Sequence, residues 1–246
     1  FGDAASSMFW KLFSMYLMFF YTDVFGISAT LVGTMFLVTR IWDAAFDPFV
    51  GILGDRTETR WGKFRPYLLW IAIPFGIIGV LTFTTPAFAQ SGKVIYAFVT
   101  YSLMMMVYSM INVPYASLMG VMTADGKERT SLATFRFIFA FGGSLLVLAL
   151  AEPLVDIFSK LGKGGVNLQL GWQLAAVVFA VIAITFFLFT FSWTRERIKP
   201  VTVKTSLKKD LNDLLNNTPW FILLGAGIAA IFFNSIRDGA AIYYFK

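Results

Sequence analysis

Cysteine and histidine are both absent from the 246 residues of this chain. Without them the chain has no ligands for a Cys/His zinc site or an iron–sulfur cluster, no disulfide, and no Ser–His–Asp or Cys–His catalytic triad. The acidic residues within its apolar stretches also lack an evident nucleophile beside them. We therefore expect neither an enzyme nor a bound cofactor.

Charged residues are scarce as well. They make up 14% of the chain, 20 basic and 14 acidic, whereas 58% of the residues are hydrophobic, and the mean hydropathy is +0.72. Soluble domains average about 25% charged and about 45–50% apolar residues, so the composition predicts a protein embedded in a lipid bilayer. The net charge of +6 indicates no nucleic-acid partner, because the basic residues lie between long apolar runs.

Seven apolar runs are each long enough to form a bilayer-spanning helix, which takes about 20 residues. They lie at about 7–25, 29–53, 67–89, 94–118, 132–151, 172–193 and 220–245. The strands of a membrane β-barrel would be about half as long and would alternate in polarity. We predict an all-α polytopic membrane protein with a six-helix bundle over 1–193, a basic cytoplasmic linker over 194–218 and a further transmembrane helix over 219–246.

The charges of the loops predict the orientation of these helices. The loops after the second, fourth and sixth runs hold twelve basic residues, and the opposite loops hold three. Because cytoplasmic loops carry an excess of Lys and Arg, we place the N-terminus in the cytoplasm and the protein in the cell (inner) membrane.

The linker has leucines at helical spacing, with lysines on the other side: Leu207, Leu211, Leu214 and Leu215. This pattern predicts an amphipathic helix, which either lies on the cytoplasmic membrane surface or, as we favour, only connects two bundles. Six helices, a linker and one more helix are expected of the first half of a larger protein whose second half follows.

Three charged residues interrupt the second apolar run, where an ionised group costs at least about 2.5 kcal/mol. Asp43 and Asp47 are four residues apart and share a helical face, with Arg40 near it. Two close carboxylates in a low-dielectric site repel each other unless a cation such as Na⁺ or a proton joins them. In the alternative interpretation Arg40 forms a fixed ion pair with one aspartate, which leaves the second unexplained.

The fourth run adds neutral polar groups. Ser109 and Asn112 are three residues apart on one face, and Tyr115 follows Pro114. Proline removes a backbone hydrogen bond and frees a carbonyl one turn earlier, which can shape a polar cavity. The kink can equally serve helix packing alone.

The first and fifth runs supply groups that suit a sugar, which has apolar C–H faces and polar hydroxyls. Ser7, Trp10 and Lys11 lie at the start of the first run, and Arg136 lies near the cytoplasmic end of the fifth. We expect them to face the same cavity. Arg136 can alternatively extend to the membrane interface without binding a ligand.

The loop between the second and third runs alternates in charge. Asp55, Arg56, Arg60 and Arg65 lie within it, and we expect them to form ion pairs that act as a cytoplasmic gate. The alternative is that these charges only set the topology. A similar charge mixture at 123–130 hints at the inverted three-plus-three helix repeats of secondary transporters.

Several motifs together resemble one transporter family. They are MYLMFFYTD at 15–23, RIWDAAFDP at 40–48, RWGKFRP at 60–66, NVPY at 112–115 and IRDGAAIYYFK at 236–246. In this combination they resemble the glycoside–pentoside–hexuronide:cation symporters, the melibiose-permease branch of the major facilitator superfamily. The resemblance extends from end to end of the chain.

The resemblance implies twelve helices in two six-helix bundles, of which this chain is the first bundle plus helix 7, and cation-driven sugar uptake by alternating access. By motif position, Asp43 and Asp47 correspond to the family's cation-site aspartates, and Ser109 to a hydroxyl that joins them. Arg136 corresponds to its sugar-site arginine, and Asn112 stands where melibiose permease has a sugar-binding aspartate.

The chain departs from the family pattern at some of these sites. The sugar-site acid of the first helix aligns with Ser7, with Asp3 one turn earlier, while Phe46 replaces an asparagine and Ala116 a tryptophan. These departures leave open which sugar is carried and whether Na⁺ or H⁺ is coupled. We expect a monomeric sugar or glycoside symporter; the alternatives are a lysolipid or amphiphile carrier and a non-transporting membrane sensor.

Overall fold

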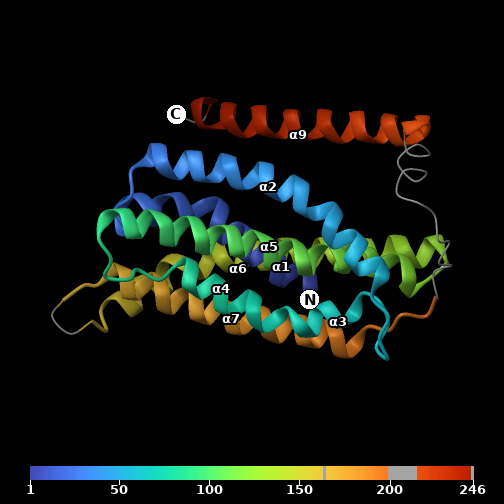
Figure 1. The fold of residues 1–246 in the computed structure, drawn as a ribbon, viewed down its shortest axis with the longest axis horizontal. Coiled ribbons are helices and arrows are strands. Elements are labelled where there is room, and N and C mark those ends of the chain that lie inside the picture. The colour runs from blue at the N-terminus through green and yellow to red at the C-terminus, as the bar shows by residue number, and fades with distance from the viewer. Residues whose placement is uncertain (163–164, 199–214, 245–246) are drawn as a thin grey trace. The chain divides into compact units, whose positions relative to one another are not determined.

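The computed structural model describes residues 1–162, 165–198 and 215–244, and every regular element in these ranges is a helix (Figure 1). The prediction of an all-α protein is confirmed. The chain divides into two compact units, Phe1–Lys199 and Pro200–Lys246. The borders predicted for the linker stay predictions, and most of its expected amphipathic helix falls on 199–214, outside the described residues.

The first unit contains the six predicted helices, two of them interrupted. The first consists of α1 (Gly2–Leu12) and two π-helical turns, η1 (Phe13–Leu17) and η2 (Phe20–Val24). The third is split into α3 (Arg65–Trp70) and α4 (Ala72–Thr82). The others are α2 (Ala29–Arg56), α5 (Gln90–Met122), α6 (Gly126–Ser159) and α7 (Leu168–Trp193). In the second unit α9 runs over Thr218–Tyr244.

Four of the described helices, α2, α5, α6 and α7, are long and apolar enough to cross a membrane. The interruption between α3 and α4 has a local cause. Pro74 has no N–H for the carbonyl of Trp70, and its ring clashes with that carbonyl, so the helix breaks at Ile71.

Helix α1 is the most buried helix of the first unit, and it packs against α5, α6 and α7 (Figure 1). Small residues allow this close packing. A side chain at Gly143 of α6 would overlap the backbone of Ala4, and one at Gly79 of α4 would overlap the ring of Phe9. The polar residues at the start of α1 are thereby held against α5 and α6.

Helix α2 packs against α5 and is exposed on its other face. Leu37, Ile41 and Phe49 are each more than half exposed in the described chain. A contiguous patch of large apolar side chains is normally covered by lipid or by another protein surface. This face of α2 therefore belongs in an apolar environment.

Candidate functional site

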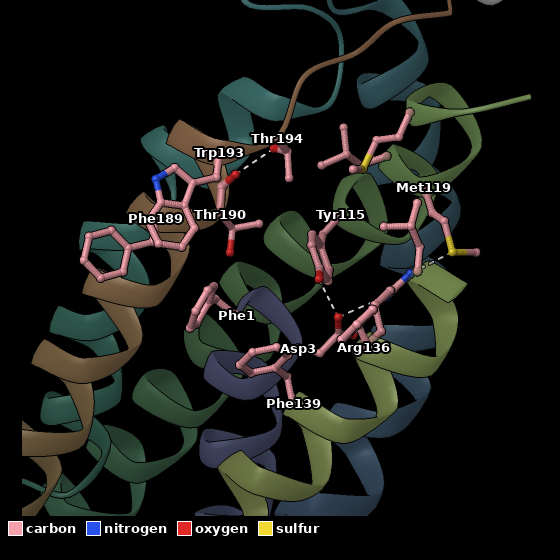
Figure 2. Close-up of a pocket in the computed structure, with 14 residues that line it drawn as sticks. Phe1, Asp3, Tyr115, Met119, Arg136, Phe139, Phe189, Thr190, Trp193 and Thr194 are labelled. Atoms are coloured by element: carbon pink, nitrogen blue, oxygen red, sulfur yellow. Dashed lines mark hydrogen bonds and ion pairs between the residues drawn. The ribbon is translucent and has the colours of Figure 1, made fainter. Parts of the chain in front are cut away.

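An ion pair between α1 and α6 is the most fully hydrogen-bonded polar feature of the first unit. Arg136 Nε lies 2.9 Å from Asp3 Oδ2 and 3.1 Å from Oδ1, and Nη2 lies 3.0 Å from Oδ1. The hydroxyl of Tyr115 on α5 donates to the same carboxylate. The Arg136 guanidinium also lies 4.7 Å from the centre of the Tyr115 ring. Figure 2 shows the three side chains converging.

This arrangement satisfies both charges. Asp3 accepts from two guanidinium nitrogens and one hydroxyl, so little of its carboxylate remains for a ligand. Asp3 and Arg136 are 17% and 28% exposed, so the arginine can still be reached from one side. The sequence predicts Arg136 and Tyr115 as site residues, but it does not predict Asp3 among them. The sequence does contain an indication of its role, because a charged residue next to an apolar run requires a partner of opposite charge.

A second cluster joins α1, α2 and α5. The Arg40 guanidinium lies 4.7 Å from the centre of the Trp10 ring, and the rings of Trp10 and Tyr108 are 5.7 Å apart. Trp10, Arg40 and Tyr101 help to line a cavity of about 220 Å³.

The predicted cation-site residues lie on α2 and α5. Asp43 is half-buried, and its Oδ1 atom is enclosed without a hydrogen-bond partner among the described residues, whereas Asp47 is exposed. Neither aspartate forms an ion pair with Arg40 in the described chain. The fixed ion pair considered as an alternative is therefore not formed here. Ser109 is buried, but within the described residues no hydrogen bond joins it to either aspartate.

In the part of the chain that the structure describes, no hydrogen bond joins the remaining predicted sugar-site residues to Arg136. The Asn112 amide donates to the carbonyl of Tyr108 within its own helix, at 2.9 Å. Ser7 is half-buried on α1, and the Lys11 ammonium has no partner among the described residues. These three residues stay predicted ligands.

The loop between α2 and α3 is held by an acid that the sequence interpretation did not single out. The Glu196 carboxylate, just after α7, accepts from the backbone N–H groups of Lys63, Phe64 and Arg65 at 2.8–3.0 Å. It therefore caps the N-terminus of α3, where unpaired N–H groups and the helix dipole favour an anion. Gly62 has a φ of +110°, and a side chain there would overlap this carboxylate.

The expected ion pairs among the loop charges do not form in the described chain. Arg65 donates instead to the carbonyl of Phe191 on α7 at 2.7 Å, and Arg60 stacks on Trp61 at 4.3 Å. The Lys63 ammonium donates to the backbone carbonyl of Asp55 at 3.2 Å. The loop is thus fixed to α7 by hydrogen bonds, while the gating role of Asp55, Arg56, Arg60 and Arg65 stays a prediction.

Comparison with known proteins shows the family of this chain. The family model described as MFS/sugar transport protein matches residues 1–246. The inner membrane symporter YicJ of Escherichia coli is 44% identical over 99% of the chain and 52% of its own length. The putative glycoside/cation symporter YagG of the same organism is 46% identical over 100% and 52%.

The isoprimeverose transporter of Lactiplantibacillus pentosus is 42% identical over 100% of the chain and 51% of its own length. The chain thus spans about half the length of the curated relatives it matches. The predicted resemblance to cation-coupled symporters is confirmed, and the relatives' names give no support to the lipid-carrier or sensor alternatives. The chain belongs to the MFS/sugar transport protein family of the major facilitator superfamily, among the glycoside–pentoside–hexuronide:cation symporters.

Proposed function

We propose that the protein containing this chain is a secondary active transporter that couples the entry of a cation, Na⁺ or H⁺, to that of a sugar or glycoside. The observation that carries the proposal is the enclosed, unpartnered carboxylate oxygen of Asp43 on α2. The printed names of the relatives, a symporter, a glycoside/cation symporter and an isoprimeverose transporter, support the same function.

The cation is held at Asp43 and Asp47. A buried oxygen without a partner is unfavourable, and a second carboxylate one turn away adds repulsion that a cation or a proton relieves. Pro48 lies inside α2 and cannot donate to the carbonyl of Ala44, which frees one more oxygen close to both aspartates. Ser109 supplies a hydroxyl from α5. Oxygen atoms of these kinds are the ligands that hard cations prefer.

The sugar lies between the two clusters. Trp10 offers an aromatic face, and Arg136 offers the guanidinium edge that Asp3 does not occupy. Ser7, Lys11, Asn112 and Tyr115 complete the polar lining of α1 and α5. Cation binding that steadies α2 then favours the arrangement that binds the sugar, and each ligand raises the affinity of the other.

We also propose where this site lies in the membrane and how the whole protein moves around it. The protein lies in the cell inner membrane with the N-terminus of α1 in the cytoplasm, acts as a monomer without a cofactor, and alternates access by movement of this bundle against a second six-helix half. The exposed apolar face of α2 is where that half and the bilayer are expected to make contact.

The proposal is tested by reconstituting the full-length protein into liposomes. Sugar counterflow and uptake are measured with a panel of glycosides, under an imposed Na⁺ gradient and then an imposed proton gradient. We expect one gradient to drive accumulation of at least one glycoside. Counterflow without any cation dependence would refute the coupling, and no counterflow with any glycoside would refute the substrate class.

A further inference from the structure

A polar cavity of about 500 Å³ lies where α5 ends, α6 begins and α7 ends, away from the aspartates of α2. Its lining includes Arg195, Arg197 and Ser131, together with Glu128 and Trp193. None of these residues takes part in the proposed cation or sugar site. The cavity adjoins the one drawn in Figure 2, which is lined by Asp3, Tyr115 and Arg136, and the two cavities share Met122, Leu132 and Trp193.

Two arginines are directed into this cavity by the segment that follows α7. The amides of Arg197 and Ile198 both donate to the carbonyl of Val121 at 3.0 Å, which ties the segment to the end of α5. Glu196 is fixed to the N-terminus of α3 by three hydrogen bonds. Arg195 and Arg197 both line the cavity, while Glu196 between them is held against α3.

The cavity carries an excess of positive charge. Neither the Arg195 nor the Arg197 side chain forms a hydrogen bond or an ion pair with another of the described residues. The single acid in the lining, Glu128, accepts from the hydroxyl of Thr123. Two unpaired guanidinium groups side by side are suited to a phosphate, which they can bind through paired N–H donors.

Aromatic side chains lie on the side where the cavity adjoins that of Figure 2: Trp193 lines both cavities and Phe189 lines the second. Trp193 is 69% exposed and Phe189 is 42% exposed, and their rings stack at 5.4 Å. Trp at the end of a transmembrane helix is typical of the headgroup level of a bilayer. A ligand that reaches Arg195 and Arg197 from this side therefore has an anionic end and an apolar body.

We propose that this cavity binds the phosphodiester headgroup of an anionic membrane phospholipid, with its acyl chains along Phe189 and Trp193. Arg195 and Arg197 bind the phosphate, and the Ser131 hydroxyl lies within the same lining for the glycerol headgroup. The bound lipid is a component of the surrounding leaflet and is not transported. By clamping the segment 194–198 against the ends of α5 and α6, it stabilises the contact that Glu196 makes with α3.

The experiment is native mass spectrometry of the full-length protein in detergent, titrated in turn with phosphatidylglycerol, phosphatidylcholine and inorganic phosphate. We expect phosphatidylglycerol to be retained about tenfold more tightly than phosphatidylcholine, the size of one charge-assisted contact. Arg195→Gln and Arg197→Gln each remove most of this preference. Lys127→Gln, which removes one charge at the same end without lining the cavity, leaves it unchanged.

Trp193→Ala provides a second variant that keeps both arginines, and it is expected to weaken phospholipid binding without affecting the binding of inorganic phosphate. Equal retention of the two phospholipids, or an unchanged preference in both arginine variants, would overturn the proposal. Displacement of the lipid by millimolar inorganic phosphate would show a small-anion site and overturn it as well.

Discussion

At the scale of single residues, the ion pair of Asp3 and Arg136 shows how this bundle tolerates charge. Both side chains are largely removed from water, so each charge is stabilised by the other. The Tyr115 hydroxyl donates a further hydrogen bond to the carboxylate. An arginine fixed by two nitrogens to an acid is a rigid group, so the edge that remains for a ligand is held in one orientation. The pair therefore both joins α1 to α6 and positions Arg136.

Asp3→Asn removes the charge while keeping the size of the side chain. We expect the full-length protein to lose about 2 kcal/mol of stability, because Arg136 keeps its charge without a partner. Thermal unfolding in detergent measures the effect. Asp156→Asn, which breaks the exposed pair with Lys160, is the control and should cost less than about 0.5 kcal/mol. Equal losses in the two variants would show that the inner pair is no more important than a surface pair.

At the scale of elements, the short helix α3 depends on a residue from a distant part of the chain. Its first N–H groups are satisfied by Glu196, more than 130 residues away. The loop that leads into it turns at Gly62, whose backbone conformation is unfavourable for residues with a side chain. Gly62 thus leaves the space in which the Glu196 carboxylate binds the N–H groups at the start of α3.

Glu196→Ala is expected to destabilise the protein by about 1–2 kcal/mol, the usual cost of losing a helix cap. The loop over 57–64 should then be cleaved faster by protease added from the side of this loop. Glu58→Ala, an exposed acid in the same loop, is the matched control. If the two alanine variants are cleaved at the same rate, Glu196 does not hold the loop.

The limits of sequence interpretation also show at this scale. Apolar runs located the helices of the first unit, because a bilayer-spanning helix needs a continuous apolar stretch. The first apolar run begins at about residue 7, whereas α1 begins at Gly2. The helix can include Asp3 because Arg136 on α6 neutralises its charge. The third helix was predicted to reach 89 but α4 ends at Thr82, before a run of threonines and Pro86.

The same reasoning explains which candidate site residues the sequence singles out. Asp43 and Arg136 stand out because a charge within an apolar run is costly. Glu196 lies among arginines in a polar segment, where nothing local distinguishes it, and its role comes only from the fold. Tyr108 is one of many aromatic residues in a chain that is 18% aromatic, so its ring contact with Trp10 could not be predicted.

At the scale of the whole molecule, the distribution of charge and the exposure of α2 bear on how the protein lies in the membrane. Basic residues concentrate at the end of the bundle that carries the α2–α3 and α5–α6 loops, and the apolar face of α2 is uncovered in the first unit. Both features fit a bundle that faces the cytoplasm with its basic end and meets another apolar surface along α2.

The orientation is tested with single cysteines, which the 246 residues do not contain. In a full-length background free of other cysteines, Lys160→Cys should react with a membrane-impermeant maleimide added to intact cells. Lys127→Cys, at the opposite end of α6, should react only after the cells are opened. Labelling of Lys127→Cys alone in intact cells would reverse the proposed topology.

The central claim is that a cation at Asp43 and Asp47 favours sugar binding, and the most direct test is the affinity of the full-length protein for its sugar with and without the coupling cation. For a coupling of about 1–3 kcal/mol, the cation should raise the affinity about 5- to 150-fold. Asp43→Asn should abolish this increase while leaving cation-independent binding, and Asp156→Asn should retain it. An undiminished cation effect in Asp43→Asn would contradict the account.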